Sequence, residues 1–201
     1  MIDTDPYEPE RRARLALIAA LLAGVLAVLT AVFPPGPAAS PPASPQEQPD
    51  VSFAWSGTRE TRQSQLEQFV RDYFHACSPR KLARALALVP EVIAATQEQQ
   101  VNPAIVGAII SLESTWDPEA VGALGEVGLM QVGRTAGVEI APGVRGQLDA
   151  GLSVLRRAYE TCGTVEGALS LYATGRNCTP YRGARLRMAL ARRIETYEGN
   201  P

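Results

Sequence analysis

Residues 102–132 read NPAIVGAIISLESTWDPEAVGALGEVGLMQV, and they predict a helix followed by a glycine-rich turn. Asn102 and Pro103 mark the helix start, because asparagine caps free backbone N–H groups and proline is pre-set for the first helical position. The residues that make the helix mainly apolar are Ile105, Ile109, Ile110 and Leu112. We interpret the rest of the chain as support for this segment.

Glu113 lies at the C-terminal end of the predicted helix, where a carboxylate is unusual. The helix dipole favours acidic side chains at the N-terminus and disfavours them in the last turn. Apolar neighbours would act in the same direction, since both effects favour the protonated form of a carboxyl group. A general acid needs a proton available near neutral pH, so Glu113 is the candidate catalytic residue. The alternative interpretation is a solvated surface glutamate.

The residues after Glu113 resemble the signature of a known family. Ser114 follows directly, a Pro-x-Ala step occupies residues 118–120, and Gly-Glu-Val-Gly-Leu-Met-Gln occupies residues 125–131. This order and spacing resemble the lytic transglycosylases of the soluble-lytic-transglycosylase (SLT), lysozyme-like type. The resemblance implies a mostly α-helical, lysozyme-like domain that uses no cofactor.

The same resemblance implies roles for further residues. Met130 and Gln131 would line the substrate cleft, Tyr172 would orient Glu113, and Ser114 would help to hold the acetamido group of the substrate. Relatives carry Tyr-Asn-Ala-Gly where this chain has Tyr-Ala-Thr-Gly from Tyr172 onward, so contacts made by that asparagine in relatives are not expected here. Without the resemblance, Tyr172 would be interpreted as a core aromatic.

Two other positions depart from the family pattern. Gly122 stands where many relatives have serine, and Glu126 stands where many have alanine. Glu126 is a candidate second acid, because a carboxylate near the cleft would permit water activation and hydrolysis.

Three functions follow as hypotheses. The resemblance implies a peptidoglycan lytic transglycosylase that cleaves the β-1,4 bond between N-acetylmuramic acid and N-acetylglucosamine. In that reaction Glu113 acts first as an acid and then as a base, and it closes a 1,6-anhydro ring. The close alternative is a muramidase that hydrolyses the same bond, and the third hypothesis is a non-catalytic wall-binding scaffold module.

The N-terminal part predicts a membrane anchor. Residues 1–14 are polar and end in three arginines, whereas residues 15–33 carry no charge. These 19 residues would form a helix of roughly 28 Å, which is enough to cross a bilayer core. One-sided arginines place the N-terminus in the cytoplasm, and the globular part in the periplasm or the extracellular space. A cleaved signal peptide is the alternative.

Residues 34–57 are rich in proline, alanine and serine, and they predict an extended linker. Residues 58–201 would then form the catalytic domain. The expected partners are peptidoglycan glycan strands, the membrane through residues 15–33, and an envelope-spanning assembly. A net charge of -2 gives no reason to expect a nucleic-acid partner.

Further helices are predicted on both sides of residues 102–132. One begins near Thr61, and the next begins at Ser78-Pro79 and is expected to be interrupted at Pro90, because proline breaks the backbone hydrogen-bond ladder. A last helix is predicted over residues 181–197. Its inner stripe would be Leu186, Ala189, Leu190 and Ile194, and its arginines, Arg182, Arg185, Arg187, Arg192 and Arg193, are interpreted as a solvated face.

The three cysteines restrict the compartment and the chemistry. Cys162 and Cys178 flank one helical hairpin and are expected to pair if the domain faces an oxidising compartment, whereas three buried thiols are the alternative. Cys77 is expected in the core in both cases. The sequence has no C-x-x-C pair and only one histidine, so no metal site is expected.

Overall fold

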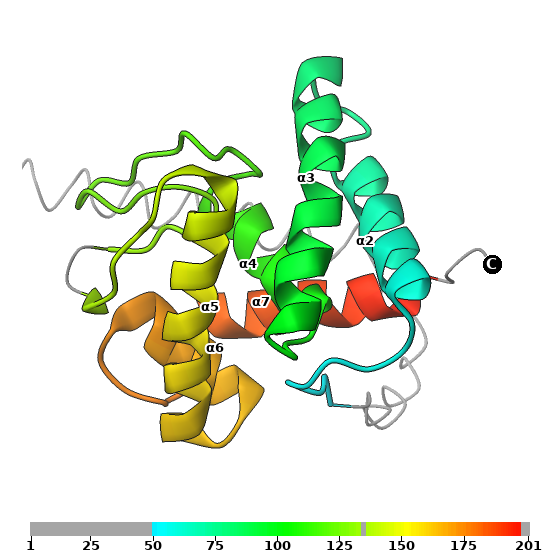
Figure 1. Cartoon of the computed structure of the whole chain (residues 1–201). Coiled ribbons are helices and arrows are strands. Elements are labelled where there is room, and N and C mark those ends of the chain that lie inside the picture. The colour runs from blue at the N-terminus through cyan, green and yellow to red at the C-terminus, as the bar shows by residue number, and fades with distance from the viewer. Residues whose placement is uncertain (1–49, 134–135, 198–201) are drawn as a thin grey trace, which may run out of the picture. The chain divides into compact units, whose positions relative to one another are not determined.

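The computed structural model describes residues 50–133 and 136–197, so the predicted anchor at 15–33 lies outside the described residues. The described part is mostly α-helical, as predicted, and its strand pairing is limited to isolated bridges. None of its helices has the length and apolar character needed to cross a membrane. The helices are α2 (Arg59–Tyr73), α3 (Pro79–Glu98), α4 (Pro103–Glu113), α5 (Gly143–Cys162), α6 (Val165–Thr174) and α7 (Arg182–Thr196) (Figure 1).

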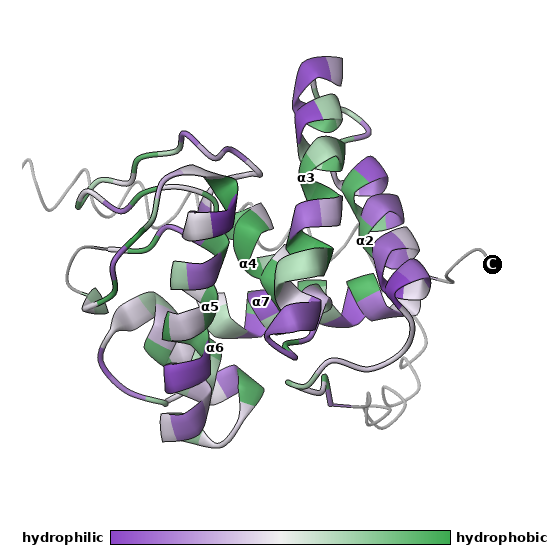
Figure 2. Cartoon of the chain, viewed as in Figure 1, coloured by the Kyte–Doolittle hydropathy of each residue, from purple (hydrophilic) through white to green (hydrophobic). Residues whose placement is uncertain are grey.

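Helix α4 is the centre of the domain. Every residue from Pro103 to Ser111 is buried, and the helix is predominantly hydrophobic along its length (Figure 2). A helix that is apolar on all sides is stable only when other elements enclose it. Helices α2, α3 and α7 pack against it. The predicted cap is present, because the Asn102 side chain accepts a hydrogen bond from the Ala104 N–H at 3.0 Å.

Pro90 does not interrupt the second predicted helix. Helix α3 runs continuously from Pro79 to Glu98 with Pro90 inside it. Pro90 is exposed, whereas Val89, Val92 and Ile93 on either side of it are fully buried. Burying such a side chain contributes about 1.5–3 kcal/mol, so three of them offset the roughly 3 kcal/mol cost of an internal proline.

The buried face of α7 differs from the predicted stripe. Leu186 is 50% exposed, Ala189 is exposed and Leu190 is only half-buried. The side chains that α7 buries are Ala184, Arg187, Met188, Ala191 and Ile194. The prediction assumed that the leucines mark the buried face. Alanines and arginines are spread along this helix, so the sequence pattern alone does not determine which face is buried. The stripe was therefore misplaced, and one arginine lies inside the fold.

Residues 50–57 pack with the helices, although the sequence suggested that they end the linker. Val51 and Phe53 are 3% and 8% exposed, and the Phe53 ring stacks on Tyr159 with centroids 3.9 Å apart. Ala54 forms an antiparallel bridge with Val101. Residues 50–57 therefore pack as part of the same compact unit as the helices.

Helices α5 and α6 form a hairpin that a disulfide closes. Cys162 and Cys178 are bonded, with Cα atoms 5.5 Å apart, as the sequence suggested. Gly151 of α5 faces the loop before it, where a Cβ would lie 2.3 Å from the Met130 sulfur. A glycine here allows close approach of the loop. The expectation of a buried Cys77 is wrong, because Cys77 is exposed in the turn that follows α2.

Replacing both Cys162 and Cys178 with serine is expected to lower the free energy of unfolding by about 3 kcal/mol, because the disulfide reduces the conformational entropy of the unfolded chain. Urea unfolding of the purified protein, followed by circular dichroism, measures this. Cys77→Ser is the matched control, since this thiol is exposed and unpaired. Equal losses in the two proteins would contradict a stabilising disulfide.

Candidate active site

Glu113 is the last residue of α4, and the backbone turns sharply after it. Thr115 and Trp116 have φ angles of 53° and 59°, in the left-handed region that residues other than glycine rarely adopt. Trp116 is fully buried, and its Nε1 donates a hydrogen bond to Ser111 Oγ at 2.9 Å. The anchored indole therefore compensates for the backbone strain and holds the turn after Glu113 in one conformation.

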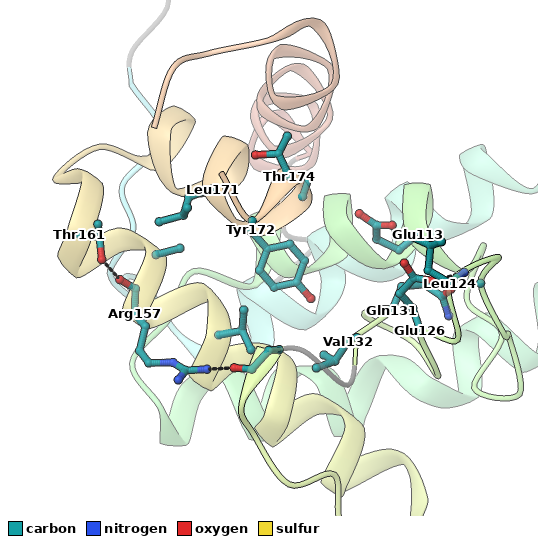
Figure 3. Close-up of a pocket in the computed structure, with 17 residues that line it drawn as sticks. Glu113, Leu124, Glu126, Gln131, Val132, Arg157, Thr161, Leu171, Tyr172 and Thr174 are labelled. Atoms are coloured by element: carbon teal, nitrogen blue, oxygen red, sulfur yellow. Dashed lines mark hydrogen bonds between the residues drawn. The ribbon is translucent and has the colours of Figure 1, made fainter. Parts of the chain in front are cut away.

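Glu113 lines a cleft of about 840 Å³ between the end of α4, the loop that follows it, α5 and the end of α6. Three other residues predicted for the site, Glu126, Gln131 and Tyr172, line the same cleft (Figure 3). In this view Glu113, Glu126 and Gln131 lie on one side of Tyr172, and Arg157 and Thr161 lie on the other. The structure therefore brings these four predicted residues together.

The side chains of Ser114 and Met130 are not among those that line the cleft. Ser114 is 8% exposed, and its Oγ donates a hydrogen bond to the Ile110 carbonyl at 3.2 Å. Met130 is fully buried and fills the space that Gly151 leaves open. Both residues support the fold around the cleft, so the geometry does not favour the substrate contacts predicted for them.

Tyr172 connects α6 to the loop that carries Gln131. Its hydroxyl donates a hydrogen bond to the Met130 carbonyl at 2.6 Å. Burial raises the pKa of Tyr172, and the nearby charge of Glu113 raises it further. The phenol therefore stays uncharged near neutral pH and remains a hydrogen-bond donor.

Gln131 presents an acceptor to the cleft. Its backbone φ is 48°, and its Nε2 donates hydrogen bonds to the carbonyls of Ala120 at 3.0 Å and Gly128 at 2.9 Å. These bonds use both donors of the amide and fix its orientation. The Oε1 atom lies beside Gly122, where an added Cβ would be 2.7 Å away. With both amide donors used, this oxygen is the atom of the side chain that can accept a hydrogen bond from a molecule in the cleft.

Gly122 and Glu126, which both depart from the family pattern, lie next to each other in the structure. The Glu126 carboxylate accepts a hydrogen bond from the Leu124 N–H at 3.0 Å. A Cβ on Gly122 would lie 2.3 Å from Glu126 Oε2, which is too close for any side chain unless Glu126 moves. Gly122 therefore makes room for the carboxylate of Glu126 at the cleft.

Arg187 is a residue of the site that the sequence did not reveal. Its side chain is 9% exposed, and its Nη2 forms a hydrogen bond and ion pair with Glu113 Oε1. Glu113 therefore has a charged partner in addition to the apolar neighbours that the sequence suggested, and the assignment of Arg187 to a solvated face is wrong. A signal was present, because Ala184 and Ala191 flank Arg187 at helical spacing on the same buried face.

Comparison with known protein families supports the resemblance predicted from the sequence. Residues 91–185 match the family model described as Transglycosylase SLT domain, which confirms that resemblance. The search of curated proteins and the search of solved structures each found no match. Among residues 50–133 and 136–197, no cluster of three or more His, Cys, Asp or Glu side chains could hold a metal ion.

Tyr172→Phe is expected to lower the free energy of unfolding by about 1–3 kcal/mol, because the carbonyl of the fully buried Met130 loses its partner. Urea unfolding measures the change. Tyr159→Phe is the matched control, since its ring is also part of the packed domain but its hydroxyl makes no hydrogen bond within the described residues. A Tyr172→Phe protein as stable as the control would show that this bond does not hold the loop.

Proposed function

We propose that this chain, which carries a transglycosylase SLT domain at residues 91–185, is a lytic transglycosylase that cleaves the β-1,4 bond between N-acetylmuramic acid and N-acetylglucosamine in peptidoglycan. The family match supports a peptidoglycan enzyme of this type. The observation that carries the specific mechanism is the position of Glu113, at the half-buried end of a buried helix and in the wall of a large cleft.

In the first step, Glu113 acts as the general acid. It donates its proton to the glycosidic oxygen as the bond from that oxygen to C1 of the muramic residue breaks. The 2-acetamido oxygen of the same residue attacks C1 from the opposite face and forms an oxazolinium ion. Such substrate assistance explains how one protein carboxylate can suffice, whereas most glycosidases need two.

In the second step, the ionised Glu113 acts as the base. It removes the proton of the C6 hydroxyl group while O6 attacks C1 and opens the oxazolinium ring. The product carries a 1,6-anhydro ring, and no water is consumed. Gln131 Oε1 would accept a hydrogen bond from a sugar hydroxyl or acetamide N–H group, because both donors of its own amide are already used.

Hydrolysis of the same bond is the second candidate function. Glu113 and Glu126 line the same cleft. Most glycosidases that hydrolyse their substrate use two catalytic carboxyl groups. In that reaction Glu126 would activate a water molecule and Glu113 would protonate the leaving group. A non-catalytic scaffold is the weakest of the three hypotheses, because wall binding alone does not require an acid held in a cleft.

For the cellular location, we propose that residues 15–33 anchor the protein in the cytoplasmic membrane and that the domain acts on its periplasmic or extracellular side. An uncharged apolar segment preceded by arginines supports this orientation. The Cys162–Cys178 disulfide also supports an oxidising compartment. Association with an envelope-spanning assembly belongs to the same proposal.

Glu113→Gln is expected to reduce the release of soluble muropeptides from purified peptidoglycan by about 10²- to 10⁴-fold, because the amide can neither donate nor accept the required proton. Mass spectrometry of the products quantifies the release. Glu119→Gln is the matched control, since Glu119 is an exposed glutamate that does not line the cleft. Unchanged formation of anhydro products by Glu113→Gln would refute the assigned role.

The nature of the product ends distinguishes the two reactions. The wild-type protein is expected to release 1,6-anhydro ends, and Glu126→Gln is expected to leave the ratio of anhydro to reducing ends unchanged. The same mass spectra give this ratio. Reducing ends in the wild-type digest that disappear in Glu126→Gln would instead establish hydrolysis with Glu126 as the base.

A further inference from the structure

Arg187 carries a positive charge into the domain beside Glu113. The Arg187 and Glu113 side chains are only 9% and 21% exposed. Arg187 Nη1 is held by the Tyr181 hydroxyl at 3.2 Å and the Gly183 carbonyl at 3.0 Å, and Nη2 contacts Glu113. Glu113 is the only carboxylate that forms an ion pair with Arg187 among residues 50–133 and 136–197. The two charges therefore depend on each other.

The phenols close to the end of α4 do not compensate for either charge. Tyr172 of α6 contributes a ring to the same cleft, and Tyr73 of α2 donates a hydrogen bond to the Ser111 carbonyl at 3.0 Å. Burial raises the pKa of both tyrosines, so both are neutral in the pH range in which a carboxyl group titrates.

The remaining charged groups near Glu113 do not replace Arg187. Glu126 lines the same cleft, but a second carboxylate cannot balance the charge of Glu113. Arg84 of α3 is occupied by Asp117, which follows α4, at 3.0 Å. In the described part of the chain, Arg187 is thus the cation that contacts Glu113 directly.

We propose that Arg187 is a positioning residue that fixes the orientation of the Glu113 carboxyl group. Its Nη2 bonds Glu113 while its Nη1 is held by Tyr181 and Gly183, so the guanidinium links the end of α4 to the start of α7. Loss of either side chain would leave the other in a largely buried place without its ion-pair partner. The catalytic meaning of this inference rests on the proposed function, but the coupling of the two side chains does not.

The guanidinium group suits this task better than an ammonium group would. Its rigid fork bonds Glu113 through one nitrogen while the other nitrogen is held by Tyr181 and Gly183. A lysine would supply the charge from a single point and lose part of this geometry. Arg187→Lys should therefore keep a positive charge beside Glu113 and restore the orientation of its carboxyl group only in part.

The coupling is tested by carbon-13 NMR of the full chain, labelled at the glutamate carboxyl groups, with the Glu113 signal assigned from Glu113→Gln. At one fixed neutral pH, the Glu113 signal is expected to move in Arg187→Met, because the guanidinium no longer contacts this carboxyl group. The signal of Arg187→Lys should lie between those of Arg187→Met and the wild type. Arg182→Met, which removes an exposed arginine from the same helix, should match the wild type. A Glu113 signal at the wild-type position in Arg187→Met would overturn the proposal.

A stability cycle provides a second test that does not depend on Arg187→Met alone. Glu113→Gln is expected to lower the Tm by about 5 °C or more, because it leaves a buried charge unpaired. Glu113→Gln combined with Arg187→Met should lose clearly less than the sum of the two single changes. A Glu113→Gln protein with the wild-type Tm would contradict the coupling.

Activity then separates this inference from the proposed function. Arg187→Met is expected to lower kcat by about tenfold or more with little change in KM, because a carboxyl group that is out of position transfers its proton less well. Arg187→Lys should recover part of this loss. An unchanged kcat alongside a moved Glu113 signal would overturn the catalytic role of Arg187. Failure of the proposed function has a different result, in which the wild type releases no anhydro products although the NMR shift and the stability coupling are both present.

Discussion

Enclosure of α4 is the constraint on which the rest of the domain depends. From Pro103 to Ser111 this helix is mainly apolar on all sides and every residue is buried, so it depends on α2, α3 and α7 to enclose it. The helix meets solvent only at its last turn, where Glu113 stands. The buried Trp116 then holds the strained turn that follows. The packing of α4 and of the turn after it thus fixes the position of Glu113, whose side chain lines the cleft.

Features with a local pattern were predictable, and features that depend on tertiary packing were not. The cap at Asn102 and the helical architecture follow from short-range chemistry, and the family resemblance led to the cleft residues Gln131 and Tyr172. The continuity of α3 through Pro90 depends on which neighbouring side chains become buried, and the sequence does not state this. The pair between Glu113 and Arg187 joins residues separated by 74 positions, and the many arginines of α7 concealed which one faces inward.

Charge, rather than hydrophobicity alone, shapes the surroundings of the proposed acid. A cation from α7 contacts Glu113, and a second carboxylate, Glu126, lies in the same cleft. The absence of a side chain at Gly122 leaves room for the Glu126 carboxylate where it stands. The proposed acid thus has a cation in direct contact and a second carboxylate in the same cleft.

The disulfide between Cys162 and Cys178 has a mechanical consequence for the cleft. Residues 171–175, which form one of its walls, lie within the covalent ring that this bond closes. A segment tied at both ends yields less to an outward force than an open one, so the bond limits how far this wall of the cleft can move. The width of the cleft is therefore linked to the redox state of the surroundings, and reducing conditions would loosen this wall without altering any residue that lines the cleft.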